Sequence, residues 1–138
     1  KISDLHNRLK LINETPDCLF ISIHQNSYPY PNNTGTQVFY SPNHPESQAL
    51  AAAIQQSVIH LIQPQNTRKV KKSGTEIYLL YQAKTPAVMV ECGFMSNAQE
   101  TEKLRTEAYQ NELALSIFYG VLSYLNGIGT ADATPAAQ

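Results

Sequence analysis

Apolar and polar positions follow two different periods along the chain, and these periods predict its helices and strands. From Lys1 to about Asn13, apolar residues recur at helical spacing until Thr15-Pro16-Asp17 interrupts the pattern. The next segment, Cys18–Ile23, is apolar at nearly every position, which is typical of a strand buried on both faces of a sheet. The pattern therefore predicts a helix that leads into a buried strand.

The middle of the chain predicts a loop, a strand and a long helix. Residues 27–35 have the composition of a loop, and Thr36–Tyr40 alternates as a strand does. A helix should follow, with Asn43 as its cap and Glu46 three residues later, and Pro64 should end it. The apolar face that we expect for this helix consists of Leu50, Ile54, Val58, Leu61 and Ile62.

The second half of the chain contains two further strand candidates. Residues 65–76 are polar and basic, and Ile77–Tyr81 is a short strand candidate. The run Ala87–Val90 is fully apolar and predicts a second buried strand, with Glu91 at its end.

Two helix signals close the chain. Asn97 and Glu100 form a capping pair typical of a helix start. A last helix is expected over Glu107–Leu125, and Asn126-Gly127 should end it. The apolar face that we expect for it consists of Leu113, Ile117, Phe118, Val121, Leu122 and Leu125. We expect the Ala- and Thr-rich residues 127–138 to be a disordered tail.

Strands that alternate with helices predict one α/β domain over residues 1–126, built on a mixed, mostly parallel sheet with helices on its faces. In open α/β sheets, ligands bind outside the carboxyl ends of the strands. His24 and Glu91 each follow a predicted buried strand, so we expect them at a common site.

The composition narrows the class of protein. The chain has 138 residues, of which 42% are hydrophobic, and a net charge of −1, as in ordinary globular domains. No apolar run approaches the roughly 20 residues of a membrane span.

The basic cluster Arg68–Lys72 is short and lacks an adjacent aromatic residue, so we expect a solvated loop that contacts the anionic cell wall rather than nucleic acid. Cys18 and Cys92 are expected to be small buried thiols without a disulfide.

His24 and Glu91 are the residues most able to carry chemistry. An imidazole at the end of a strand can be a zinc ligand, a general base or a packed histidine bonded to backbone. A carboxylate directly after Val88-Met89-Val90 is costly to bury unpaired, because desolvation disfavours its charged form. Glu91 therefore calls for a metal, a cation or a role in proton transfer, and the residues alone leave these alternatives open.

Two long motifs resemble those of the zinc-dependent N-acetylmuramoyl-L-alanine amidases of bacterial cell walls and phage endolysins. Leu19–Asn26 (LFISIHQN) is similar to the family motif FISIHxN, and Pro86–Asn97 (PAVMVECGFMSN) is similar to PAVLVExGFxSN. Gly35–Tyr40, Arg68–Lys71 and Ala108–Gln110 fall in the family's order. The resemblance covers nearly residues 1–125 and is closest to the spore-cortex branch.

This resemblance implies a peptidoglycan hydrolase that works outside the cytoplasmic membrane, in the cell wall or the spore cortex. His24 would bind zinc, and Glu91 would be the catalytic carboxylate beside the attacking water. Gln25 and Asn26 follow the metal ligand directly and are candidates for contact with the substrate. The bond cleaved would join N-acetylmuramic acid to the L-alanine of the stem peptide.

The chain departs from the family pattern in its metal ligands. The family's other two zinc ligands, a histidine in a GHGG motif and a glutamate, have no counterpart here, and His6, His44 and His60 do not replace them. Because the chain begins with Lys1, we expect a piece cut or processed from a longer protein, truncated at its N-terminus and inactive by itself. The alternative is a degenerate domain that binds wall polymer without cleaving it.

Overall fold

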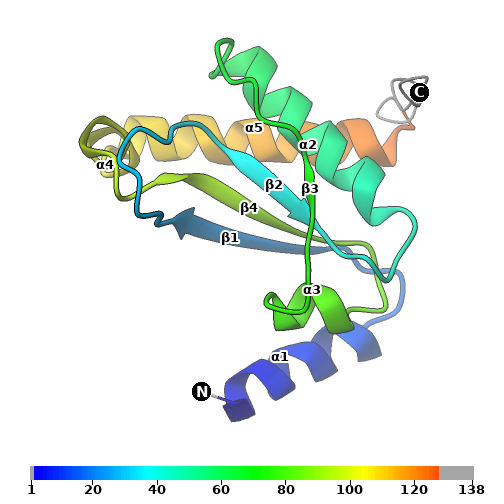
Figure 1. Ribbon diagram of the computed structural model, residues 1–138. Coiled ribbons are helices and arrows are strands. Elements are labelled where there is room, and N and C mark those ends of the chain that lie inside the picture. The colour runs from blue at the N-terminus through cyan, green and yellow to red at the C-terminus, as the bar shows by residue number, and fades with distance from the viewer. Residues whose placement is uncertain (1, 128–138) are drawn as a thin grey trace, which may run out of the picture.

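The computed structural model of the protein describes residues 2–127, and within them the chain forms five helices and four strands (Figure 1). In chain order these are α1 (Ile2–Glu14), β1 (Phe20–Asn26), β2 (Gln37–Tyr40), α2 (Ser47–Leu61), β3 (Lys71–Lys72), α3 (Tyr78–Gln82), β4 (Ala87–Phe94), α4 (Ala98–Leu104) and α5 (Glu107–Leu125). The helices expected at the beginning of the chain and over Glu107–Leu125 are confirmed. The expected tail lies outside the described residues, apart from Gly127.

The strands form one mixed sheet in the order β1-β4-β2-β3. β1 pairs parallel to β4 and β2 parallel to β3, whereas β2 runs antiparallel to β4. The expected fold class, a mostly parallel sheet with helices on its faces, is confirmed. Because of these directions, the carboxyl ends of β1 and β4 meet the beginning of β2 at one edge of the sheet.

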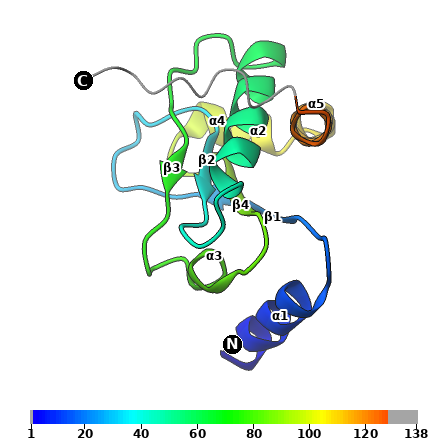
Figure 2. The same ribbon diagram turned by 90° about the vertical axis from the view of Figure 1, so that its right-hand side faces the viewer.

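Helices cover both faces of the sheet (Figure 2). On one face α2 and α5 pack over a core that includes Val38, Val88 and Val90. Gly120 of α5 allows the two helices to approach closely, because a Cβ atom there would lie 2.5 Å from the Cα of Ile54. On the other face a smaller core of Ile12, Leu80 and Met89 lies under α1 and α3. None of the helices within residues 2–127 is long and apolar enough to cross a membrane.

The strand expected over Ile77–Tyr81 is wrong, because this segment forms the one-turn helix α3. The backbone N–H of Tyr81 donates to the carbonyl of Ile77 at 2.9 Å, and Leu80 is fully buried. A short apolar run buried on one side has no period that separates a turn of helix from a strand.

The expected start of α2 is also wrong. The helix begins at Ser47 with Glu46 as its N-cap residue, and no side chain caps it. Asn43 instead donates its side-chain amide to the carbonyl of Tyr81, which ties the loop before α2 to α3. Leu61 is exposed rather than part of the buried face, as are Phe118 and Leu125 on α5.

The strand that carries His24 is longer and less buried than expected. β1 continues through Asn26, so His24 lies inside the strand rather than after its end. None of its residues is fully buried, since among the described residues β1 has β4 as its only neighbour in the sheet. By contrast, β4 is buried at all eight positions, as a central strand with helices on both faces should be.

Both cysteines are free, as expected, but Cys18 is only partly buried. The thiol of Cys18 lies 3.8 Å from the hydroxyl of Thr85, at the beginning of the β1–β4 pair. Cys92 is buried near the opposite end of β4. The length of the strand pair therefore separates the two thiols.

Candidate active site

His24 and Glu91 lie side by side on neighbouring parallel strands, in direct register. Side chains at paired positions point to the same face of a sheet, so the imidazole and the carboxylate share one side. Val90 before Glu91 packs into the core under α2 and α5, so Glu91 points to the face that carries α1 and α3. The structure thus brings together the two residues that the sequence singled out.

The carboxylate of Glu91 is buried without a complete set of partners. The residue is 8% exposed, and its Oε2 atom has no hydrogen-bond partner among the described residues. Burial raises the pKa of Glu91 above its ordinary value, and the nearby charge of His24 lowers it in part. An unsatisfied buried carboxylate oxygen is costly, so this atom is suited to a metal, a cation or a transferable proton.

The other histidines lie away from this pair. His6 stacks against Tyr78 with ring centroids 5.8 Å apart, and His44 accepts a hydrogen bond from the backbone of Glu46. Residues 2–127 contain no group of three or more His, Cys, Asp or Glu side chains that could hold a metal ion. One imidazole and one carboxylate fit part of a zinc site, which usually has three protein ligands.

A β-bulge follows the pair and changes which side chains share its face. The register runs from His24↔Glu91 to Asn26↔Phe94, so β4 has one residue more than β1 over this interval. The extra residue returns Phe94 to the face of Glu91. Gly93 lies in the bulge, where a Cβ atom would be 2.7 Å from the Glu100 carboxylate.

Gln25 and Asn26, the expected contacts for substrate, lie beside this bulge. Gln25 is exposed, and the backbone carbonyl of Asn26 accepts from the N–H of Met95 at 2.7 Å. Both residues therefore stay at the carboxyl edge of the sheet, next to His24.

Two residues that the sequence did not single out, Gln37 and Arg68, lie beside the candidate site. Gln37 pairs with Glu91 across the antiparallel β2–β4 ladder. Arg68 is half-buried, unlike the solvated loop residue that we expected, and its guanidinium lies 4.5 Å from the ring centroid of Phe94. The partial burial of Arg68 cannot be predicted from a run of basic residues, because the three lysines of the same run are exposed.

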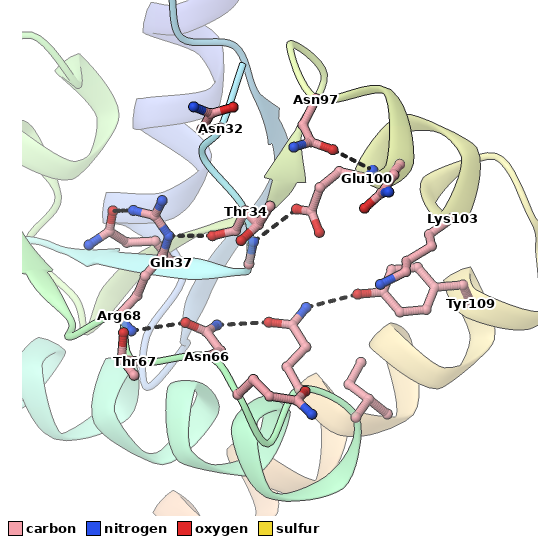
Figure 3. A pocket seen from close by; sticks show the side chains of 15 residues that line it. Asn32, Thr34, Gln37, Asn66, Thr67, Arg68, Asn97, Glu100, Lys103 and Tyr109 are labelled. Atoms are coloured by element: carbon pink, nitrogen blue, oxygen red, sulfur yellow. Dashed lines mark hydrogen bonds between the residues drawn. The ribbon is translucent and has the colours of Figure 1, made fainter. Parts of the chain in front are cut away.

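Arg68 and Gln37 line a cavity of about 620 Å³ at this edge of the sheet (Figure 3). The wall of this cavity is polar, and many of its polar groups form hydrogen bonds with one another. Glu100 accepts from the backbone N–H of Gly35 at 2.9 Å, and Gln63 donates to the Tyr109 hydroxyl at 2.8 Å. The expected capping pair is confirmed, because the Asn97 side chain accepts from the N–H of Glu100.

The comparison with known families matches almost the whole described chain. The family described as N-acetylmuramoyl-L-alanine amidase matches residues 1–123. Among curated proteins, the germination-specific N-acetylmuramoyl-L-alanine amidase of Bacillus subtilis (strain 168) is 36% identical over 129 residues, which are 94% of this chain and 54% of the relative. The chain therefore spans about half the length of that relative.

Solved structures have the same fold. The CwlD amidase from Clostridioides difficile, solved in complex with the GerS lipoprotein, is 34% identical with a TM-score of 0.86, over 91% of this chain and 64% of that one. The N-acetylmuramoyl-L-alanine amidase from Clostridium difficile 630 is 31% identical with a TM-score of 0.80, over 88% of this chain and 65% of that one.

Proposed function

Since the chain belongs to the N-acetylmuramoyl-L-alanine amidase family, we propose that it is part of a zinc-dependent peptidoglycan hydrolase. The bond cleaved would be the amide between the lactyl group of N-acetylmuramic acid and the L-alanine that begins the stem peptide. The proposal concerns the whole protein, because the chain spans about half the length of its relative.

The observation that carries this proposal is the buried Oε2 atom of Glu91, which lies beside His24 and has no hydrogen-bond partner among the described residues. A carboxylate whose pKa is raised by burial accepts a proton more readily than an exposed one. Glu91 would take a proton from the attacking water and pass it to the departing amine of L-alanine. Its fixed place inside β4 would hold the proton acceptor at one position during both transfers.

His24 is the residue that would hold zinc, with an exposed imidazole at the edge of the sheet. Zinc, when bound, would polarise the scissile carbonyl and lower the pKa of a water molecule to about 7. Further protein ligands would have to join His24, because the described residues form no group of three. Gln25 and Asn26 would contact the substrate next to the metal.

The substrate also indicates where the protein would act. Peptidoglycan lies outside the cytoplasmic membrane, so we place the protein in the cell wall or the spore cortex. The name of the Bacillus subtilis relative, germination-specific, favours the cortex. The alternative is a domain that binds wall polymer without cleaving it, since the part of the chain that the structure describes has one imidazole and one carboxylate at this place but no group of three ligands.

The test is digestion of purified peptidoglycan by the full-length, zinc-loaded protein, with the products identified by mass spectrometry. The proposal predicts free stem peptides that begin with L-alanine and intact glycan strands. Cleavage of glycosidic bonds, or binding of peptidoglycan without release of peptides, would contradict it.

A further inference from the structure

Arg68 is a cation held in place without a carboxylate partner. Within residues 2–127 the structure has one ion pair, between Arg8 and Asp4, and it does not include Arg68. The guanidinium instead donates to three neutral oxygens: the carbonyl of Thr34 at 2.6 Å, the side chain of Asn33 at 3.2 Å and that of Gln37 at 3.4 Å. The positive charge of Arg68 is thus oriented but not neutralised.

These contacts leave part of the guanidinium free for a ligand. The group has five N–H donors, and the three hydrogen bonds use one on each nitrogen. One donor therefore remains on each terminal nitrogen. The ring of Phe94 under the guanidinium fixes its plane, so little side-chain entropy remains to be lost when an anion binds.

Arg68 is connected to the candidate catalytic residue Glu91 through one intervening residue, Gln37. Gln37, which accepts from Arg68, is the cross-strand partner of Glu91. Neighbouring strands are about 4.8 Å apart, so Arg68 lies on the order of one to two strand spacings from Glu91. The bulge puts Phe94 on the face of Glu91, so the guanidinium above this ring also shares that face.

The cavity beside Arg68 has an excess of positive charge. Two of its lining residues, Arg68 and Lys103, are cations, and the carboxylate is that of Glu100. Glu100 already accepts from the backbone N–H groups of Gly35 and Phe94. An anionic ligand in this cavity would therefore meet a guanidinium with two unused N–H donors and a carboxylate whose Oε2 atom already accepts two hydrogen bonds.

We infer that Arg68 binds a carboxylate of the stem peptide, namely the free α-carboxylate of the γ-linked D-glutamate that follows L-alanine. This inference rests on the proposed function and names the group that the site recognises. Consecutive residues are about 3.8 Å apart, so this carboxylate lies roughly 6–8 Å from the scissile carbonyl, which matches the separation of Arg68 from Glu91. Arginine binds carboxylates through two parallel N–H donors, and one free donor on each terminal nitrogen fits this geometry.

The experiment uses the full-length, zinc-loaded protein and two muramyl tripeptides that differ at one group. Both contain L-alanine, the glutamate and L-lysine with a C-terminal carboxamide, and the glutamate α-carboxyl is either free or amidated. The lysine and the terminal carboxamide remove every other stem carboxylate. We expect kcat/KM to favour the free carboxylate by about 10- to 100-fold, the usual range for a hydrogen bond to a charged group.

Variants separate recognition from a structural role of Arg68. Arg68→Gln should abolish the preference, and Arg68→Lys, which keeps the charge without the paired donors, should retain a reduced one. The matched control Lys72→Gln removes a positive charge from an exposed position of β3 and should keep the full preference. If Arg68→Gln slows both substrates equally and keeps their ratio, Arg68 only supports the loop and the inference is wrong.

A binding measurement distinguishes failure of this inference from failure of the proposed function. Calorimetry with the Glu91→Gln protein measures the affinity for both tripeptides without hydrolysis. The same preference in Kd, lost when Arg68→Gln is added, supports the inference even if no amide is cleaved. Hydrolysis of both tripeptides at equal rates, with equal affinities, would overturn the inference and leave the proposed function standing. A preference that appears only when a terminal or diaminopimelate carboxylate is restored would also overturn it.

Discussion

The carboxylate of Glu91 and the imidazole of His24 lie side by side, in register on two parallel strands, and one oxygen of the carboxylate has no partner within residues 2–127. The two residues come from motifs 67 positions apart in the chain. The parallel pairing of β1 with β4 is what brings them to one point, at the edge where open α/β sheets bind ligands.

We expect the 138-residue chain by itself to bind zinc weakly. A catalytic zinc usually has three protein ligands, and the described residues offer no group of three. Glu91 could reach the metal, but it would then no longer serve as the proton acceptor. Titration with zinc beside the full-length protein, with wall digestion in parallel, measures this. Tight, stoichiometric zinc and full activity in the 138-residue chain would contradict our assignment.

Glu100→Gln should destabilise the protein by about 1–3 kcal/mol, the usual cost of disrupting a buried charged hydrogen-bond acceptor. The Glu100 carboxylate accepts from Gly35 and Phe94, so the loop before β2 should also become more susceptible to proteolysis. Urea unfolding and limited proteolysis measure both effects. The matched control is Glu102→Gln, an exposed position on the same helix, which should change stability by less than about 0.5 kcal/mol. Equal effects of the two changes would contradict the role of Glu100.

Gly120→Ala should destabilise the protein by about 1–3 kcal/mol through overpacking. In an open helix the same change would stabilise by about 1 kcal/mol, because alanine is the better helix former. The added Cβ would lie 2.5 Å from the backbone of Ile54, so α2 and α5 would have to separate. Thermal unfolding measures the effect, with Asn111→Ala at an exposed position of α5 as control. A more stable Gly120→Ala protein would show that the helices do not approach so closely.

Cys18 should react with iodoacetamide faster than Cys92 in the folded protein. Burial, with a smaller effect from Glu91, raises the pKa of Cys92 from 9.0 to about 11, so little thiolate forms at neutral pH. Because the unfolded chain ionises this thiol first, its contribution to stability should decline as pH rises from about 9 to about 11. Mass spectrometry of the labelled peptides measures the two rates.

Unfolding the protein without reductant should then expose two free thiols per chain. A disulfide between Cys18 and Cys92, or faster labelling of Cys92, would contradict the arrangement of β1 and β4.

The elements with strong periodicity or a distinct motif were predictable from the sequence. The helix over Glu107–Leu125 and the buried strand that begins at Ala87 follow from local patterns that tertiary packing reinforces, although this strand continues through Glu91 to Phe94 instead of ending at Val90. Asn43 was assigned wrongly, because its side chain bonds the carbonyl of Tyr81, 38 positions away, through a contact that no local pattern records. Ile77–Tyr81 was assigned wrongly because so short an apolar run has no period that separates helix from strand.

The candidate site was predictable only in part, for the same reason. His24 and Glu91 stand at strand positions that local sequence reveals, and the paired registers then place them together. Arg68 lies in a run of basic residues that predicts a solvated loop. Its contact with the ring of Phe94, which comes from a strand distant in the sequence, leaves no sign in that run. Gln37 likewise belongs near the site only because it pairs with Glu91 across the β2–β4 ladder, and the sequence of β2 alone does not predict this register.

The role of Glu91 is tested most directly by Glu91→Gln in the full-length protein, with zinc content and peptidoglycan cleavage measured on the same sample. Glutamine keeps the size of the side chain but cannot accept the proton, and loss of a general base typically costs about 10²- to 10⁴-fold in rate. We predict that cleavage falls by this factor while zinc stays bound at the wild-type stoichiometry. Cleavage at a rate near that of the wild type would contradict the role of Glu91, and loss of zinc together with activity would make Glu91 a metal ligand instead.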